Sequence, residues 1–261
     1  MIRSFKAELL KLRRRRVAVV ATVGALAFAV IATTAVFLSA TQTAGPRGRG
    51  ATIESLSGAG GATEAFALGA SFVGLLVLVL FIANVAGELS QGTIRTLLMR
   101  QPRRLALLAG KMAALLAFVA GVLMLAEVLT VAASAAIAPS QDVATSSWFG
   151  LDGLGEAASD YASALLGVCA WALLGMAIAV FVRSIPIALG IGIVWAGPFE
   201  HILQDSWTSA DRWFPGLLLE SLTAGGTDDV AFGRALALIA VYVAVAVSAA
   251  AVVFARRDVT G

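Results

Sequence analysis

Few side chains in this sequence have the types and spacing that catalysis requires. His201 is the only histidine and Cys169 the only cysteine, so a metal cluster, an internal disulfide and Cys-His catalysis all lack a second residue. Gly110 and Lys111 are followed by Met112 and lack the upstream glycine of a phosphate-binding loop. We therefore expect no catalytic residue, no metal site and no bound cofactor in this chain.

Glu127 is the one acidic residue deep within a long apolar run. It lies about 16 residues beyond Lys111, which is roughly 24 Å along a helix at 1.5 Å per residue. A charge at mid-bilayer costs roughly 2.5 to 3.5 kcal/mol on insertion scales, so the carboxyl is expected to face protein or a wet cavity. Three roles stay open: lining a substrate path, a structural hydrogen bond between helices, and proton relay.

Residues 88–110 form a short basic segment, ELSQGTIRTLLMRQPRRLALLAG, between two apolar runs. Ile94, Leu97 and Leu98 fall at i, i+3 and i+4, so on a helix they share one apolar face. Such a helix would have about two turns and would need a partner to pack on. Its expected start and stop signals are Gly92, Thr93 and Pro102.

The composition around these residues is that of a membrane protein, with 59% hydrophobic residues, 13% charged residues and a mean hydropathy of +0.91. Windows of about 18 or more residues nearly free of charge predict helices that cross a hydrocarbon core of about 30 Å. The sequence therefore predicts an all-α polytopic membrane protein, one transmembrane domain over residues 1–261. Six predicted spans run approximately over residues 17–38, 65–86, 111–136, 161–182, 186–203 and 232–255.

The basic residues orient these spans, because Lys and Arg are retained on the cytoplasmic side. A cytoplasmic N-terminus puts 15 of the 19 basic residues inside, and it also predicts a cytoplasmic C-terminus. The basic residues lie beside the spans rather than in a soluble domain, so the pI near 9.5 indicates contact with anionic lipid headgroups and not with nucleic acid.

Two regions flanking the spans have amphipathic patterns. In residues 1–16, apolar positions recur at three- and four-residue spacing beside a basic face, which predicts an interfacial helix. The alternative is a cleaved signal peptide, but the apolar run of about 22 residues exceeds the usual 7 to 15. Pro198 predicts a kink or early end of the fifth span. Residues 204–231 then form an outer loop with short amphipathic pieces, either re-entrant helices or an interfacial aromatic belt.

The N-terminal KAELLKLRRRR, the six spans and the basic segment together resemble an ABC-2 type transporter permease. The resemblance in the segment rests on the order and spacing of Glu88, Gly92, Thr93, Leu97, Leu98, Pro102, Arg103, Arg104, Gly110 and Lys111. Outside the segment and the N-terminus, the likeness is one of pattern, and it extends over nearly the whole chain.

The resemblance implies the permease subunit of an exporter in the bacterial cytoplasmic membrane. A separate cytoplasmic ATP-binding cassette ATPase would bind ATP and magnesium, and two permease subunits, identical or related, would form the path. The N-terminal helix would rest on the ATPase, and Glu127 is a candidate for the substrate path. The segment would be the coupling helix, with the coupling residues Glu88, Gly92, Thr93, Ile94, Arg95, Leu97, Leu98, Pro102, Arg103 and Arg104.

Other interpretations remain beside this one. The basic segment is also consistent with a plain cytoplasmic turn that sets topology, although this leaves its leucines at helical spacing unexplained. An immunity or sensing subunit with a permease-like fold is a further alternative. An ion-coupled secondary transporter would show more ionisable residues in the spans, and a membrane enzyme would need a nucleophile with its base.

Overall fold

The computed structural model describes residues 2–40, 51–91, 104–207 and 209–256. Within these ranges the chain is helical and contains no strand. The α-helices are α1 (Ile2–Leu12), α2 (Arg15–Ser39), α3 (Ile53–Ser57), α4 (Glu64–Ser90), α6 (Arg104–Ile137), α7 (Leu151–Val182), α8 (Ile185–Val194), α9 (Glu200–Ser206), α10 (Pro215–Thr223) and α11 (Phe232–Arg256). Short non-α turns are η1 (Ala59–Ala62), η2 (Ala138–Gln141), η3 (Trp195–Phe199) and η4 (Ala210–Arg212).

Six helical stretches are long and apolar enough to cross a membrane, which confirms the predicted number of apolar spans and the all-α class. α7 begins at Leu151, well before the predicted start at Tyr161, because hydropathy detects only the charge-free part of a helix that extends further. The stretches are Arg15–Ser39, Glu64–Ser90, Leu105–Gln141, Leu151–Val182, Ile185–Ser206 and Phe232–Arg256.

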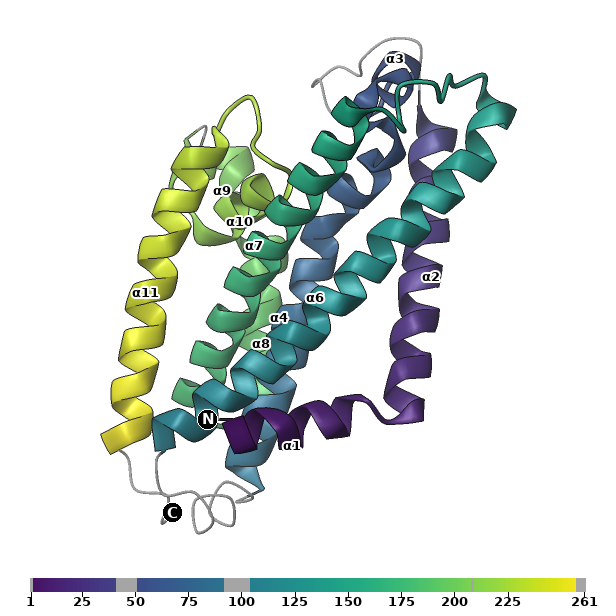
Figure 1. The fold of residues 1–261 in the computed structure, drawn as a ribbon. Helices are drawn as coiled ribbons and strands as arrows, with labels where there is room; N and C mark the ends of the chain where they lie inside the picture. The colour runs from purple at the N-terminus through teal and green to yellow at the C-terminus, as the bar shows by residue number, and fades with distance from the viewer. Residues whose placement is uncertain (1, 41–50, 92–103, 208, 257–261) are drawn as a thin grey trace.

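α4 and α7 form the centre of the bundle, and α2 and α11 lie at its edges (Figure 1). α1 is a separate helix that lies across the end of the bundle where α11 finishes, while α3, α9 and α10 lie at the opposite end (Figure 1). Arg14 has an extended backbone between α1 and α2, and this residue makes the turn from the crosswise helix into the first span. The two ends of the bundle thus differ: one carries α1 and the helix ends that flank the basic segment, and the other carries α3, α9 and α10.

Glycines allow the two central helices to approach closely. A Cβ on Gly175 of α7 would lie 2.8 Å from the backbone oxygen of Leu78 in α4, and one on Gly74 of α4 would lie 2.2 Å from the Trp171 ring in α7. Since lipid is as apolar as the side chains themselves, close packing between helices rather than hydrophobic burial holds such spans together. The α4 and α7 pair is therefore the rigid centre on which the other helices are placed.

The fifth span is interrupted by a π-helical turn, Trp195–Phe199, that contains Pro198. Proline has no N–H to donate to the preceding turn, which accounts for the irregularity expected there. Beyond it, the buried carboxylate of Glu200 accepts hydrogen bonds from Trp195 Nε1 at 2.5 Å and from the backbone N–H of Leu217 at 3.0 Å. Leu217 lies in the first turn of α10, where N–H groups favour a negative charge, so Glu200 fixes this short helix to the end of the fifth span.

Candidate functional site

A buried lysine connects three helices at the end of the bundle that carries α1. Lys111 lies in the second turn of α6, Glu88 lies near the end of α4, and Glu8 lies on the inner face of α1. Lys111 and Glu8 are only 7% and 8% exposed. Because α1 packs against α6 and α4 returns beside it, all three side chains meet although Glu8 and Lys111 are far apart in sequence.

The contacts form a chain of ion pairs. Lys111 Nζ donates to Glu88 Oε1 at 2.5 Å and to Glu8 Oε1 at 2.9 Å. Lys11 Nζ, one turn further along α1, donates to Glu8 Oε2 at 2.9 Å. Two ammonium groups therefore face two carboxylates, and the charges of these four side chains balance, as buried charges require.

The two lysines lower the pKa of Glu8. Burial raises its pKa, but the hydrogen bonds from Lys111 and Lys11, together with their positive charges, outweigh burial and hold the pKa of Glu8 below its ordinary value of 4.5. The carboxyl is thus ionised at neutral pH and attached to α6. This interaction makes α1 an integral part of this end of the bundle.

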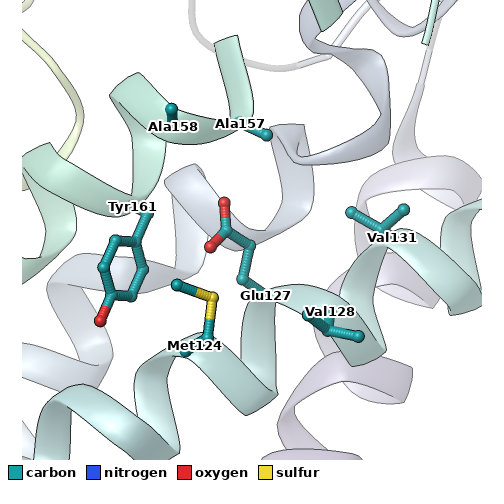
Figure 2. A pocket seen from close by; sticks show the side chains of 7 residues that line it. All are labelled: Met124, Glu127, Val128, Val131, Ala157, Ala158 and Tyr161. Carbon is teal, nitrogen blue, oxygen red and sulfur yellow. The ribbon is translucent and has the colours of Figure 1, made fainter. Parts of the chain in front are cut away.

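A second site lies between α6 and α7, in a cavity of about 390 Å³. Figure 2 shows the Glu127 carboxyl pointing from α6 towards α7, with Tyr161 and Met124 beside it. The Tyr161 hydroxyl donates to the backbone oxygen of Ala120 at 3.1 Å, which fixes the ring at the cavity wall. The lining residues are Met124, Glu127, Val128 and Val131 of α6 with Ala157, Ala158 and Tyr161 of α7.

Glu127 is 6% exposed, and its Oε1 atom has no hydrogen-bond partner among the described residues. A buried polar atom without a partner costs free energy, so an orphaned carboxylate oxygen is an unusual feature. Asp160 lies near enough for its charge to repel that of Glu127, and it is itself held by a 2.6 Å hydrogen bond from the Thr63 hydroxyl. The cavity is therefore an apolar space with one acidic group in its wall and a second acid close by.

Comparison with known proteins identifies a family for the chain. Residues 28–260 match the family model described as a protein of unknown function, DUF2705. The chain belongs to the DUF2705 family. The match includes Glu88, Lys111 and Glu127 and begins within α2, so it leaves Glu8 outside. No curated protein and no solved structure matches this DUF2705 chain.

The predicted coupling residues divide between described and undescribed parts of this DUF2705 chain. Glu88 is placed in α4, where it pairs with Lys111, and Arg104 begins α6. Residues 88–90 and 104–110 belong to α4 and α6, so the connection between these helices is shorter than residues 88–110. The remaining coupling residues, Gly92, Thr93, Ile94, Arg95, Leu97, Leu98, Pro102 and Arg103, lie outside the described residues.

Sequence reasoning missed the residues that the fold brings close to Lys111 and Glu127. Glu8 gave a usable signal, since it is an acid within an otherwise basic N-terminal helix, three residues before Lys11. Glu200 was visible only as a residue after Pro198, and nothing in its local pattern indicated that it holds α10. Asp160 directly precedes the predicted fourth span, residues 161–182, whereas it lies within α7.

Proposed function

We propose that this chain is the permease subunit of an ATP-binding cassette exporter in a bacterial cytoplasmic membrane. In this proposal the segment between α4 and α6 is the coupling helix, and a separate cytoplasmic ATPase binds ATP and magnesium. The chain itself carries out no catalysis, and two permease subunits form the substrate path. The six apolar spans support this assignment, together with the resemblance of the segment to ABC-2 type permeases.

The observation that carries the proposal is the cluster of Glu8, Lys111 and Glu88. Glu88 and Lys111 lie on the two helices that flank the segment, and their 2.5 Å ion pair joins its two flanks. Glu8 extends the same cluster to α1. A force applied to the segment by a closing ATPase would thus act on α4, α6 and α1 together. Coupling also requires that the segment binds the open and closed states of the ATPase with different affinities.

The plain topology-loop interpretation needs no such cluster. A turn that only sets orientation requires basic residues on the correct side, and it places no demand on a buried lysine bridging two carboxylates. The cost of burying Lys111 and Glu8 is understandable if this end of the bundle must stay rigid. Rigidity is what a lever between an ATPase and the spans requires.

The first test is capture of the affinity-tagged chain from its native membrane. We expect an ATPase with a phosphate-binding loop to copurify, and we expect the isolated chain to hydrolyse no ATP. Hydrolysis by the isolated chain, freed of any partner, would contradict the proposal. So would a functional complex that contains no ATPase.

The second test changes Leu97 and Leu98 to Asp together. Each leucine lost from an interface costs roughly 1.5 to 3 kcal/mol, so association with the ATPase should weaken more than tenfold. The matched control makes the same two changes at Leu151 and Leu154, which are 88% and 62% exposed in the first turn of α7. Unchanged ATPase affinity in the Leu97 and Leu98 variant would leave the topology-loop interpretation as the correct one.

A further inference from the structure

We propose that the cavity between α6 and α7 binds a lipophilic organic cation, with the Glu127 carboxylate holding the cationic group. That this ligand is the transported substrate rests on the proposed function, whereas its binding to the cavity does not. The inference starts from a buried carboxyl oxygen that the fold leaves without a hydrogen-bond donor. Glu127 is 6% exposed and its Oε1 accepts no hydrogen bond from any described residue.

A positive charge placed beside this oxygen would offset the cost of the orphaned acceptor, whether or not the cation also donates a hydrogen bond. A carboxylate that contacts a cation also avoids the penalty of an unpaired charge in a low-dielectric surrounding. The geometry therefore favours a ligand that carries a positive charge.

The surroundings of Glu127 favour a positive charge over a neutral donor. Asp160 adds a second negative group near the cavity, and Glu64 and Glu156 in turn lie near Asp160. The Tyr161 ring, fixed by its hydrogen bond to Ala120, provides an aromatic wall, and aromatic rings attract cations. An anion would meet repulsion from these acids.

The other lining residues indicate that the rest of the ligand is apolar. Apart from Glu127 and Tyr161, the wall consists of methionine, valine and alanine side chains. The volume of about 390 Å³ lies within the range of small-molecule sites. Met124 and Val128 are 44% and 57% exposed on the face of a membrane-spanning helix, so the apolar ligand has a route from the bilayer.

The experiment measures binding of tetraphenylphosphonium to the purified full chain in lipid nanodiscs, with empty nanodiscs as background. Tetraphenylborate has nearly the same size and shape with the opposite charge, so it is the matched ligand control. We compare wild type with Glu127→Gln, which keeps the shape and removes the charge. Glu54→Gln makes the same change at an exposed acid of α3, and it is the matched protein control.

We expect saturable binding of tetraphenylphosphonium to wild type and Glu54→Gln, and at least tenfold weaker binding to Glu127→Gln, equivalent to about 1.4 kcal/mol. Val128→Trp should also weaken binding by narrowing the cavity while leaving Glu127 in place. Equal binding by Glu127→Gln at unchanged thermal stability would overturn the proposal. So would equal binding of tetraphenylborate by wild type.

Should Glu127→Gln fail to fold, Val128→Trp decides: unchanged binding in that variant places the ligand elsewhere. These measurements contain no ATPase. Loss of cation binding would therefore refute the cavity assignment without touching the coupling proposal, and absence of an ATPase partner would refute the coupling proposal without touching the cavity.

Discussion

The substitution Lys111→Met tests the ion-pair cluster most directly. It removes the cation and keeps a side chain of similar length. The Lys111 side chain is 9% exposed and its partners Glu8 and Glu88 are 10% and 21% exposed, so both carboxylates lose a close partner in a place that water scarcely reaches. Breaking a buried ion pair from one side costs about 3 to 5 kcal/mol, because it leaves an uncompensated charge.

Lys11 is 53% exposed, so its ion pair with Glu8 offsets only a small part of this loss. Exposed pairs of this kind contribute only about 0.2 to 1 kcal/mol. The matched control Lys11→Met should therefore lower the free energy of unfolding by less than about 1 kcal/mol. At about 2 to 4 °C per kcal/mol for a domain of this size, Lys111→Met should melt roughly 6 to 20 °C below wild type.

The single cysteine of the chain provides the assay. Cys169 is half-buried in α7, so its reaction with a thiol-reactive dye reports unfolding in detergent without any added label. The triple variant Glu8→Gln, Glu88→Gln, Lys111→Met should recover most of the lost stability, because it removes both negative charges together with the ammonium group that they pair with. A triple variant that melts no higher than Lys111→Met, or equal melting of Lys111→Met and Lys11→Met, would refute this reasoning.

Two further predictions concern stability. The pKa of Glu8 lies below 4.5 in the folded chain, so its ion pairs stabilise the fold fully above about pH 4.5 and lose their effect as the pH falls through the lowered value. The difference in melting temperature between wild type and Glu8→Gln should therefore vanish in acid. A difference that does not change with pH would show that the charge of Glu8 is irrelevant. Gly175→Ala should lower the free energy of unfolding by roughly 1 to 3 kcal/mol, because the added Cβ would lie 2.8 Å from the Leu78 backbone oxygen. In the control Gly121→Ala the added Cβ would have no atom within 4 Å, so the free energy of unfolding should change by less than about 1 kcal/mol in the same thiol assay. Equal melting of these two variants would mean that α4 and α7 can separate at no cost.

The spans and the class of the fold could be read from the sequence because both depend on local properties. An apolar stretch of about 20 residues can satisfy its backbone in lipid only as a helix, wherever it packs. The break at Pro198 follows from the same local chemistry, since the missing N–H acts within one turn. The boundary predicted at residue 16 differs from the observed one, because α1 ends at Leu12 and the chain turns at Arg14, so that residues 15 and 16 belong to α2.

The contacts that make up the candidate sites were decided by tertiary structure. Lys111 was visible as a basic residue at the start of a span, but its pairing with Glu8 depends on α1 folding back across α6. Glu127 was predicted to face protein or a cavity, yet the apolar lining and the approach of Tyr161 and Asp160 depend on how α6 and α7 diverge. Hydropathy and periodicity describe one helix at a time, whereas ion pairs and cavities arise between helices, and their geometry follows from packing such as that of Gly175 against Leu78.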